Sequence, residues 1–221
     1  MAAPRPHVAE ARPLPALGFE VDSAQAVRFA AAPTLAFALR IAADRPLASL
    51  ALNVQIRIAP GRRRYSDADR ERLVELFGPP ERWDEALRTF RWTQASLHVP
   101  GFDSNTEVVL AVPATYDFEV ATAKYFYALE DGDVPLELLF SGTIFFRESD
   151  GRLQTAQIPW ESEAAFRLPV RVWKEAVEAH FPQSAWVRVQ DDVFERLVAY
   201  KARHTLPTWD AVLEKLLKDG S

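Results

Sequence analysis

The sequence predicts an α+β fold: an antiparallel β-sandwich-like core with an inserted helical segment and C-terminal helices. Apolar and polar residues alternate with a period of two through most of 19–58 and 94–158, which is typical of strands with one buried face. Apolar residues recur at spacings of three and four near 66–90 and 169–218, which indicates helices there. Turn compositions such as EDGD and ESDG separate the strand-like runs.

The N-terminus differs in composition from the rest of the chain. Residues 1–17 include Pro4, Pro6, Pro13 and Pro15, a density that disfavours helices and ladder strands. We therefore expect a flexible Pro-rich tail at 1–17 and a single α+β domain at 18–221. The first residues contain no apolar run long enough for a secretory signal, and no run approaches a membrane span. These observations predict a cytoplasmic protein without membrane insertion.

The elements can be placed in order along the chain. The first strands are predicted in FEVDSAQAVRF, LAFALRI and LALNVQIRI. A helix should begin after Ser66, with Asp69 at the capping-box position, and end at Gly78, before a second short helix from Glu81. Further strands are predicted in TQASLHV, TEVVLAV, DFEVATAKYFYAL, ELLFSGTIFF and LQTAQIPW. Three helices should follow in LPVRVWKEAVEAHFP, DDVFERLVAYKARHTL and TWDAVLEKLL, the last capped by Thr208.

Two segments echo one another: DRPLASLALNVQIRI at 44–58 and DVPLELLFSGTIFF at 133–146. Each has Asp two residues before Pro, Leu after it, and then an apolar run. We interpret the copies as two related hairpins that supply equivalent strands to two packed sheets or to one long sheet. Both a true internal duplication and a chance match remain open.

Composition and motifs disfavour several classes of chemistry. The chain has no Cys, which removes thiolate catalysis, iron–sulfur clusters and cysteine-based zinc sites. His7, His98, His180 and His204 are not at metal-ligand spacings, and phosphate-binding loops and a serine elbow are lacking. A net charge of −5 argues against a nucleic-acid scaffold. We therefore predict no catalytic residues, metal or cofactor. A carboxylate enzyme using Glu161 and Glu163 remains an alternative.

The strongest polar feature is the run Arg62-Arg63-Arg64-Tyr65 directly before the Ser66 cap. Guanidinium groups beside a helix N-terminus can bind an anion or an acidic partner. The alternative is intramolecular pairing with the acidic residues that follow, which are Asp67, Asp69 and Glu71.

The chain is rich in large aromatic residues, with 6 Trp and 14 Phe. Most should lie in the core, but Trp dominates many interface hot spots. Trp83, Trp160 and Trp186 are therefore candidate interface aromatics.

Four strings together carry a family resemblance: FGPPERWDEAL, DVPLELLFSGTIFF, LPVRVWKEAVEAHFP and TWDAVLEKLL. With them the chain resembles, from about Pro33 to Leu217, an uncharacterised bacterial family classed as a domain of unknown function. The resemblance implies genes near those of actinobacterial-type nickel–iron hydrogenases, and hence a hydrogenase subunit or maturation factor as partner. It supplies no catalytic residues.

These observations predict a non-enzymatic cytoplasmic accessory or assembly protein that acts through protein–protein contacts. The principal alternative is a small-molecule or chaperone-like binding module with an aromatic-lined cleft between the sheet and the C-terminal helices.

Overall fold

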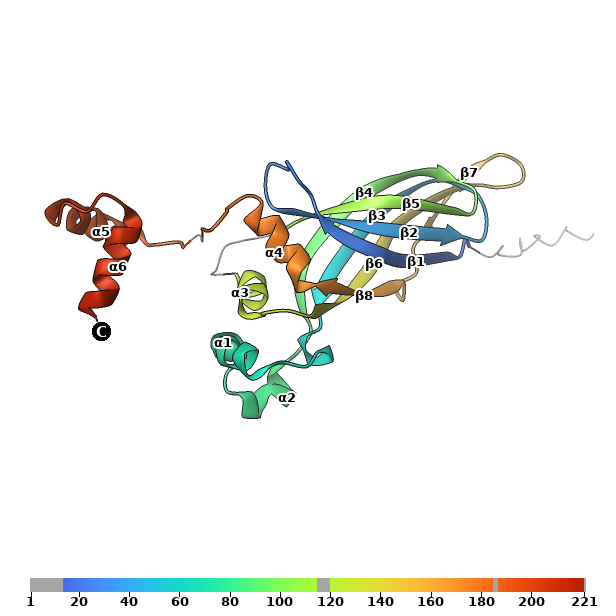
Figure 1. The fold of residues 1–221 in the computed structure, drawn as a ribbon. Coiled ribbons are helices and arrows are strands. Elements are labelled where there is room, and N and C mark those ends of the chain that lie inside the picture. Colours follow the sequence, from blue (N-terminus) through green and yellow to red (C-terminus); the bar gives the residue numbers. More distant parts are fainter. Residues whose placement is uncertain (1–13, 115–119, 185–186, 221) are drawn as a thin grey trace, which may run out of the picture.

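The computed structural model describes residues 14–114, 120–184 and 187–220. Its core consists of two antiparallel sheets packed face to face (Figure 1). The first sheet has the order β1-β2-β5, and the second has the order β4-β3-β6-β7, with β8 also paired to β6. The strands are β1 (Leu17–Ala26), β2 (Thr34–Ala43), β3 (Leu47–Ile58), β4 (Phe90–Phe102), β5 (Asn105–Pro113), β6 (Asp133–Arg147), β7 (Leu153–Gln157) and β8 (Glu163–Pro169).

Strand alternation in the sequence becomes the inner and outer faces of these sheets. In β3, Leu50, Leu52 and Val54 are at most 1% exposed, whereas the intervening residues are partly exposed. The two sheets meet through such inward side chains, for example where Phe19 stacks on Phe140 with ring centroids 4.1 Å apart. The α+β class with a sandwich-like core is therefore confirmed.

Strand β6 organises the second sheet because two short strands share its outer edge. Its first half, to Leu139, pairs with β8, and its second half, from Thr143, pairs with β7. Gly142 lies at this change of partner with φ 139°, and a Cβ there would lie 2.0 Å from the carbonyl oxygen of Ala51. Glycine is therefore required where β6 approaches β3 most closely.

The two echoed segments do not form two hairpins, which corrects that part of the prediction. The 44–46 turn connects β2 to β3, and these strands belong to different sheets. The second copy follows a helix instead of a strand. The copies form β3 and nearly all of β6, which pair antiparallel at the centre of one sheet, with Leu47 opposite Phe146 and Ile58 opposite Leu136. Pairing between distant segments decided this arrangement, and a local pattern does not encode it.

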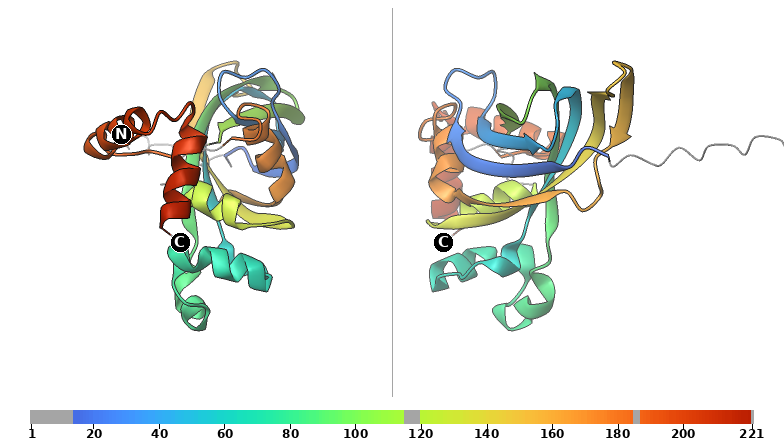
Figure 2. Two further views of the ribbon diagram at one scale, coloured as in Figure 1. Left: turned by 60° about the vertical axis from the view of Figure 1, so that its left-hand side comes forward. Right: turned by 90° about the vertical axis from the view of Figure 1, so that its right-hand side faces the viewer.

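Helices cover one end of the sandwich. The insertion after β3 contains the 3₁₀ turn η1 (Pro60–Arg62), α1 (Asp67–Phe77), the 3₁₀ turn η2 (Pro80–Arg82) and α2 (Trp83–Ala86), and the later helices are α3 (Ala121–Ala128) and α4 (Val170–Glu178). Helices α1 and α2 lie below the sandwich in every view (Figure 1 and Figure 2). Trp173 of α4 is fully buried and stacks on Phe126 of α3, with ring centroids 4.9 Å apart.

Helix α3 corrects the strand predicted in DFEVATAKYFYAL. Residues 115–119 lie outside the described ones, but 121–128 are helical. The segment is rich in aromatic residues and is buried at Thr122, Ala123, Tyr125 and Phe126. Because its apolar residues face neighbours on several sides, the sequence shows no clear period by which a helix could be told from a strand.

The remaining helices, α5 (Asp191–Arg203) and α6 (Trp209–Asp219), form a hairpin that stands away from the sandwich in Figure 1. Both helices and the Thr208 cap agree with the sequence prediction, and the Thr208 hydroxyl accepts from the Ala211 amide at 3.1 Å. Phe194 packs on Trp209 between the helices. Val212 is the buried residue of the described hairpin. The predicted tail lies mostly outside the described residues, and β1 begins at Leu17.

Candidate functional site

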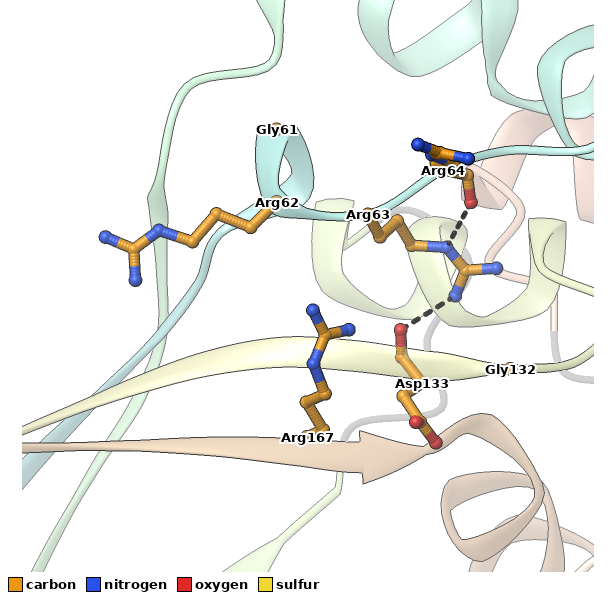
Figure 3. Close-up of a pocket in the computed structure, with 7 residues that line it drawn as sticks. All are labelled: Gly61, Arg62, Arg63, Arg64, Gly132, Asp133 and Arg167. Atoms are coloured by element: carbon orange, nitrogen blue, oxygen red, sulfur yellow. Dashed lines mark hydrogen bonds between the residues drawn. The ribbon is translucent and has the colours of Figure 1, made fainter.

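The predicted arginine run lies on the segment that leaves β3 and enters α1. Pro60 and Gly61 start η1, and Ser66 then caps α1. The capping box forms as predicted, because the Ser66 hydroxyl accepts from the Asp69 amide at 3.0 Å and the Asp69 carboxylate accepts from the Ser66 amide at 3.3 Å. A cavity of about 540 Å³ opens beside this segment (Figure 3). Its lining residues are Gly61, Arg62, Arg63, Arg64, Gly132, Asp133 and Arg167.

Arg63 has a structural role. Its side chain is only 7% exposed and lies 3.4 Å from the Asp69 carboxylate. The guanidinium also donates to the backbone carbonyls of Asp131 at 2.9 Å and Asp133 at 3.2 Å. Gly132, with φ 81°, forms the turn between these two carbonyls. Arg63 thus joins the start of β6 to the start of α1, and it defines the floor of the cavity.

Tyr65 is also held inside the protein. Its hydroxyl donates to the carbonyl oxygen of Pro60 at 2.8 Å and shares a hydrogen bond with the Tyr125 hydroxyl at 2.8 Å. Burial raises the pKa of Tyr65 well above its ordinary value, and the nearby Tyr125 raises it further. Burial likewise raises the pKa of Tyr125 to about 12. Both phenols are therefore neutral structural groups at ordinary pH.

The other arginines of the cavity are exposed to solvent. Arg62 is 63% exposed and forms an ion pair with Glu137 of β6 at 2.8 Å. Arg64 and Arg167 are both exposed, and no carboxylate among the described residues forms an ion pair with either. Figure 3 shows Arg167 extending from β8 toward the segment that carries Arg62 and Arg63. The prediction of an anion site at Arg62–Tyr65 remains a prediction, and its available cations are Arg62, Arg64 and Arg167.

The register of the second sheet brings more arginines to the same side. Arg57 of β3 lies opposite Arg91 of β4 on one side and opposite Glu137 of β6 on the other. Arg57 faces outward, because its neighbours Ile56 and Ile58 are fully buried. We call Arg57, Arg62, Arg91 and Arg167 the basic strip. The alternation around Arg57 indicated an outward side chain, but the strip itself depends on register.

The predicted interface aromatics lie in different environments. Trp83 is 6% exposed and donates its indole N–H to the Gly78 carbonyl at 2.9 Å, so it belongs to the core. Trp160 is 90% exposed in the turn before β8 and remains a candidate for contact. Trp186 lies outside the described residues. The candidate carboxylates Glu161 and Glu163 are both exposed, near Trp160.

The described histidines lie in separate parts of the fold. His98 is exposed on β4, and His204 contacts Tyr200 at the end of α5. His180 lies between the carbonyl oxygens of Ala30 at 2.8 Å and Ala176 at 2.9 Å. Within the described ranges, no three His, Asp or Glu side chains gather in an arrangement that could hold a metal ion. His7 lies outside these ranges.

A larger cavity, of about 880 Å³, lies beside α4. Tyr127 is the partly exposed aromatic residue of its lining, Trp173 and Val177 lie behind it as buried residues, and basic and acidic residues such as Lys174 and Glu178 surround them. The Nζ atom of Lys174 donates to the Leu129 carbonyl at 2.6 Å. This is the place in the fold where the predicted aromatic-lined cleft would lie.

The fold and its surfaces define an α+β protein with a sandwich-like core, an arginine-lined cavity and a projecting helical hairpin. None of the helices in the described ranges is both long and apolar enough to cross a bilayer. The chain belongs to DUF6084, a family of unknown function, whose model matches residues 14–221. This confirms the domain of unknown function that the sequence resembles.

Other comparisons give only remote likenesses. No curated protein matches the sequence. A β-glucosidase from Kluyveromyces marxianus is 10% identical, with a TM-score of 0.27, over 69% of this chain and 15% of that one. β-Glucosidase 3B from Thermotoga neapolitana, in complex with α-D-glucose, is 15% identical, with a TM-score of 0.24, over 68% of this chain and 17% of that one. At these TM-scores neither likeness bears on fold or function.

Proposed function

We propose that this protein is a non-enzymatic accessory or assembly protein that acts through protein–protein contacts. The observation that carries the proposal is the α5–α6 hairpin, in which α5 has no buried residue. Six apolar side chains on the two helices are between 37% and 52% exposed; they are Val193, Phe194, Val198, Trp209, Leu213 and Leu216. Apolar surface concentrated on one projecting element is typical of an interaction site.

The hairpin also has a groove that a partner can occupy. A groove of about 380 Å³ lies between its helices, with Val193, Leu197 and Leu216 in its lining. Arg196 and Arg203 line the same groove. An amphipathic helix of a partner, with apolar residues on one face and acidic residues beside them, complements this combination of apolar surface and positive charge. Burying one Leu or Val side chain completely contributes about 1.5–3 kcal/mol.

The family resemblance suggests which partner to seek. The resemblance noted in the sequence implies genes near those of nickel–iron hydrogenases, and on that basis we propose a hydrogenase subunit or maturation factor as partner, in the cytoplasm. The role is assembly or support of that enzyme through contact, because the exposed surfaces just described are suited to contact and the described histidines are dispersed.

Affinity purification from the native host tests this proposal. Tagged wild-type chain should retain one protein in stoichiometric amount, identified by mass spectrometry and then shown to bind the purified chain directly. Leu216→Glu places a charge in the hairpin groove and should abolish the complex. Leu153→Glu is the matched control, because Leu153 is 53% exposed on β7. Equal retention by both variants, or substrate turnover by the purified chain, would contradict the proposal.

A second candidate function is binding of a small molecule in the α4 cavity. Its volume of about 880 Å³ is in the range of ligand sites, and the partly exposed Tyr127 could pack against an apolar ligand. Native mass spectrometry of chain purified from the host would show a bound molecule. Ala179→Trp, at the exposed end of α4, should reduce its occupancy if this cavity holds it.

A further inference from the structure

The basic strip crosses four strands on the outer face of the second sheet. Arg91, Arg57 and Glu137 are cross-strand neighbours. Arg167 lies two register positions further along, opposite Pro135. Arg62 reaches the strip from η1 and forms its ion pair with Glu137. Since neighbouring strands are about 4.8 Å apart, the strip from β4 to β8 spans about 14 Å.

Charge is concentrated here against the trend of the whole molecule. The chain has a net charge of −5, yet the strip and its cavity contribute five exposed or half-exposed arginines when Arg64 is included. Glu137 lies within the strip, and it offsets the charge of Arg62. The Asp133 carboxylate, which is at the cavity edge, points away from the guanidinium groups in Figure 3. The strip therefore has positive charge left over.

An apolar recess adjoins the arginine-lined cavity. A second cavity of about 230 Å³ shares Arg62 and Arg167 with the first, and its other lining residues are Pro135, Leu136, Ala165 and Phe166. An anion held between these arginines would therefore lie next to room for a small apolar group. Inorganic phosphate would use only the charged half of this surface.

The width of the basic strip favours an extended ligand over a compact anion. A compact anion needs two or three guanidinium groups focused on one point. Here the arginines lie in a row on separate strands, which suits several carboxylates spaced along an extended chain. About five extended residues span about 14 Å. Alternate residues of such a segment would face the sheet.

We infer that the basic strip binds an acidic, extended segment of a partner protein, with an Asp or Glu side chain between Arg62 and Arg167 and an apolar side chain in the adjoining recess. The inference depends on the proposed function only in that the segment belongs to a protein partner. Arg63 is a positioning residue, because its contacts to Asp69 and to the Asp131 and Asp133 carbonyls fix the loop that carries Arg62 and Arg64.

Fluorescence anisotropy with the full chain tests the inference. The probe is a labelled, end-capped peptide of about eight residues in which the sheet-facing positions carry Glu and Leu in turn and Ser stands between them, and its control has Gln in place of Glu. Wild-type chain should bind the Glu peptide at least about tenfold more tightly than the Gln peptide, and added salt should weaken that binding. Arg57→Ala combined with Arg167→Ala should weaken binding about tenfold or more.

Arg152→Ala is the matched control, because Arg152 is 79% exposed in the β6–β7 turn and pairs with Asp150. It should leave peptide affinity unchanged. Circular dichroism of each variant establishes that it is folded. Equal affinity of the wild-type chain for the Glu and Gln peptides would overturn the inference. So would a loss of peptide affinity in Arg152→Ala equal to that of the double variant. Inorganic phosphate that binds at submillimolar concentration and displaces the peptide would also overturn it, in favour of a phosphate site.

The two proposals can fail separately. If the peptide does not bind but the host partner is lost on Leu216→Glu, the inference about the basic strip is wrong and the proposed function stands. Arginine-dependent peptide binding without any stoichiometric partner from the host would remove the proposed function.

Discussion

The arginine-rich loop at 60–66 and the C-terminal hairpin of α5 and α6 differ in what they bury: the loop buries polar groups, whereas the hairpin exposes apolar ones. In the loop, Arg63, Tyr65, Asp69 and Tyr125 form a buried polar cluster, which we call the Arg63 cluster, and each member has a hydrogen-bond partner within 3.4 Å. In the hairpin, apolar side chains remain partly in water and Val212 is the residue that is buried. The cluster is bound to the rest of the fold at several points, whereas the hairpin's two helices pack mainly on each other.

This contrast indicates where stability and where contact are expected to reside. A buried and fully bonded polar group is costly to disturb, because its partner is left without compensation. A short helical hairpin with little buried surface opens locally at low free energy and gains stability when a partner covers it. The four predictions below test this difference, in order of expected effect.

The largest effect should come from Asp69→Ala. The change leaves the Arg63 guanidinium buried without its counter-charge and removes the α1 capping box. We expect the free energy of unfolding to fall by about 3–5 kcal/mol. Urea denaturation of the variant measures this loss. Asp67→Ala, at a 98% exposed carboxylate in the same helical turn, should cost less than about 1 kcal/mol. Equal losses for the two variants would contradict the assignment.

Alkaline pH should destabilise the Arg63 cluster next most strongly. The folded-state pKa of Tyr125 is about 12 and its ordinary value is 10.0, so the folded state retains a proton that the unfolded state releases. Stability from this group is complete below pH 10 and falls by about 1.4 kcal/mol per pH unit between pH 10 and 12. Urea denaturation at pH 9 and 11 measures the change. Tyr125→Phe should reduce the slope but not remove it, because burial also raises the pKa of Tyr65, and an unchanged slope would refute this origin.

A smaller and local effect is expected from Val212→Ala in the hairpin. Val212 is fully buried on α6, so its truncation should lower hairpin stability by about 1–2 kcal/mol. Because the hairpin stands apart from the sandwich, hydrogen exchange should accelerate in α5 and α6 and stay unchanged in β3 and β6. Acceleration in the sheets as well would show that the hairpin and sandwich unfold as one unit.

The smallest effect should come from Tyr65→Phe. The substitution removes the hydroxyl that bonds the Pro60 carbonyl and the Tyr125 hydroxyl, but it keeps the ring against Trp83. We expect a loss of about 1 kcal/mol in the free energy of unfolding. Tyr200→Phe is the matched control, because it removes a hydroxyl that donates to the exposed Asp219 carboxylate at 3.3 Å, and it should change stability by less than about 0.5 kcal/mol. A neutral Tyr65→Phe would show that these hydrogen bonds contribute little.

Several elements could be predicted because their signals are local. The alternation of Leu50, Leu52 and Val54 predicts β3, and Ser66 with Asp69 predicts the start of α1. Helix α3 was missed because Tyr125 and Phe126 are buried among neighbours from distant segments, and that burial obscures the helical period. The sequence indicates a cluster of arginines at 62–64, but it does not indicate the partner of each arginine.

The amino-acid sequence by itself determined most of the strands and helices, though not α3, and it determined where α1 and α6 are capped and which residues of β3 face outward. These properties depend on residues within a few positions of one another. Only the tertiary structure decided that the two echoed segments pair as β3 and β6, that Arg63 is buried while Arg62 is exposed, and that Arg57, Arg91 and Arg167 share one face. Register, burial and charge pairing depend on contacts between distant residues, and the local pattern is compatible with several of them.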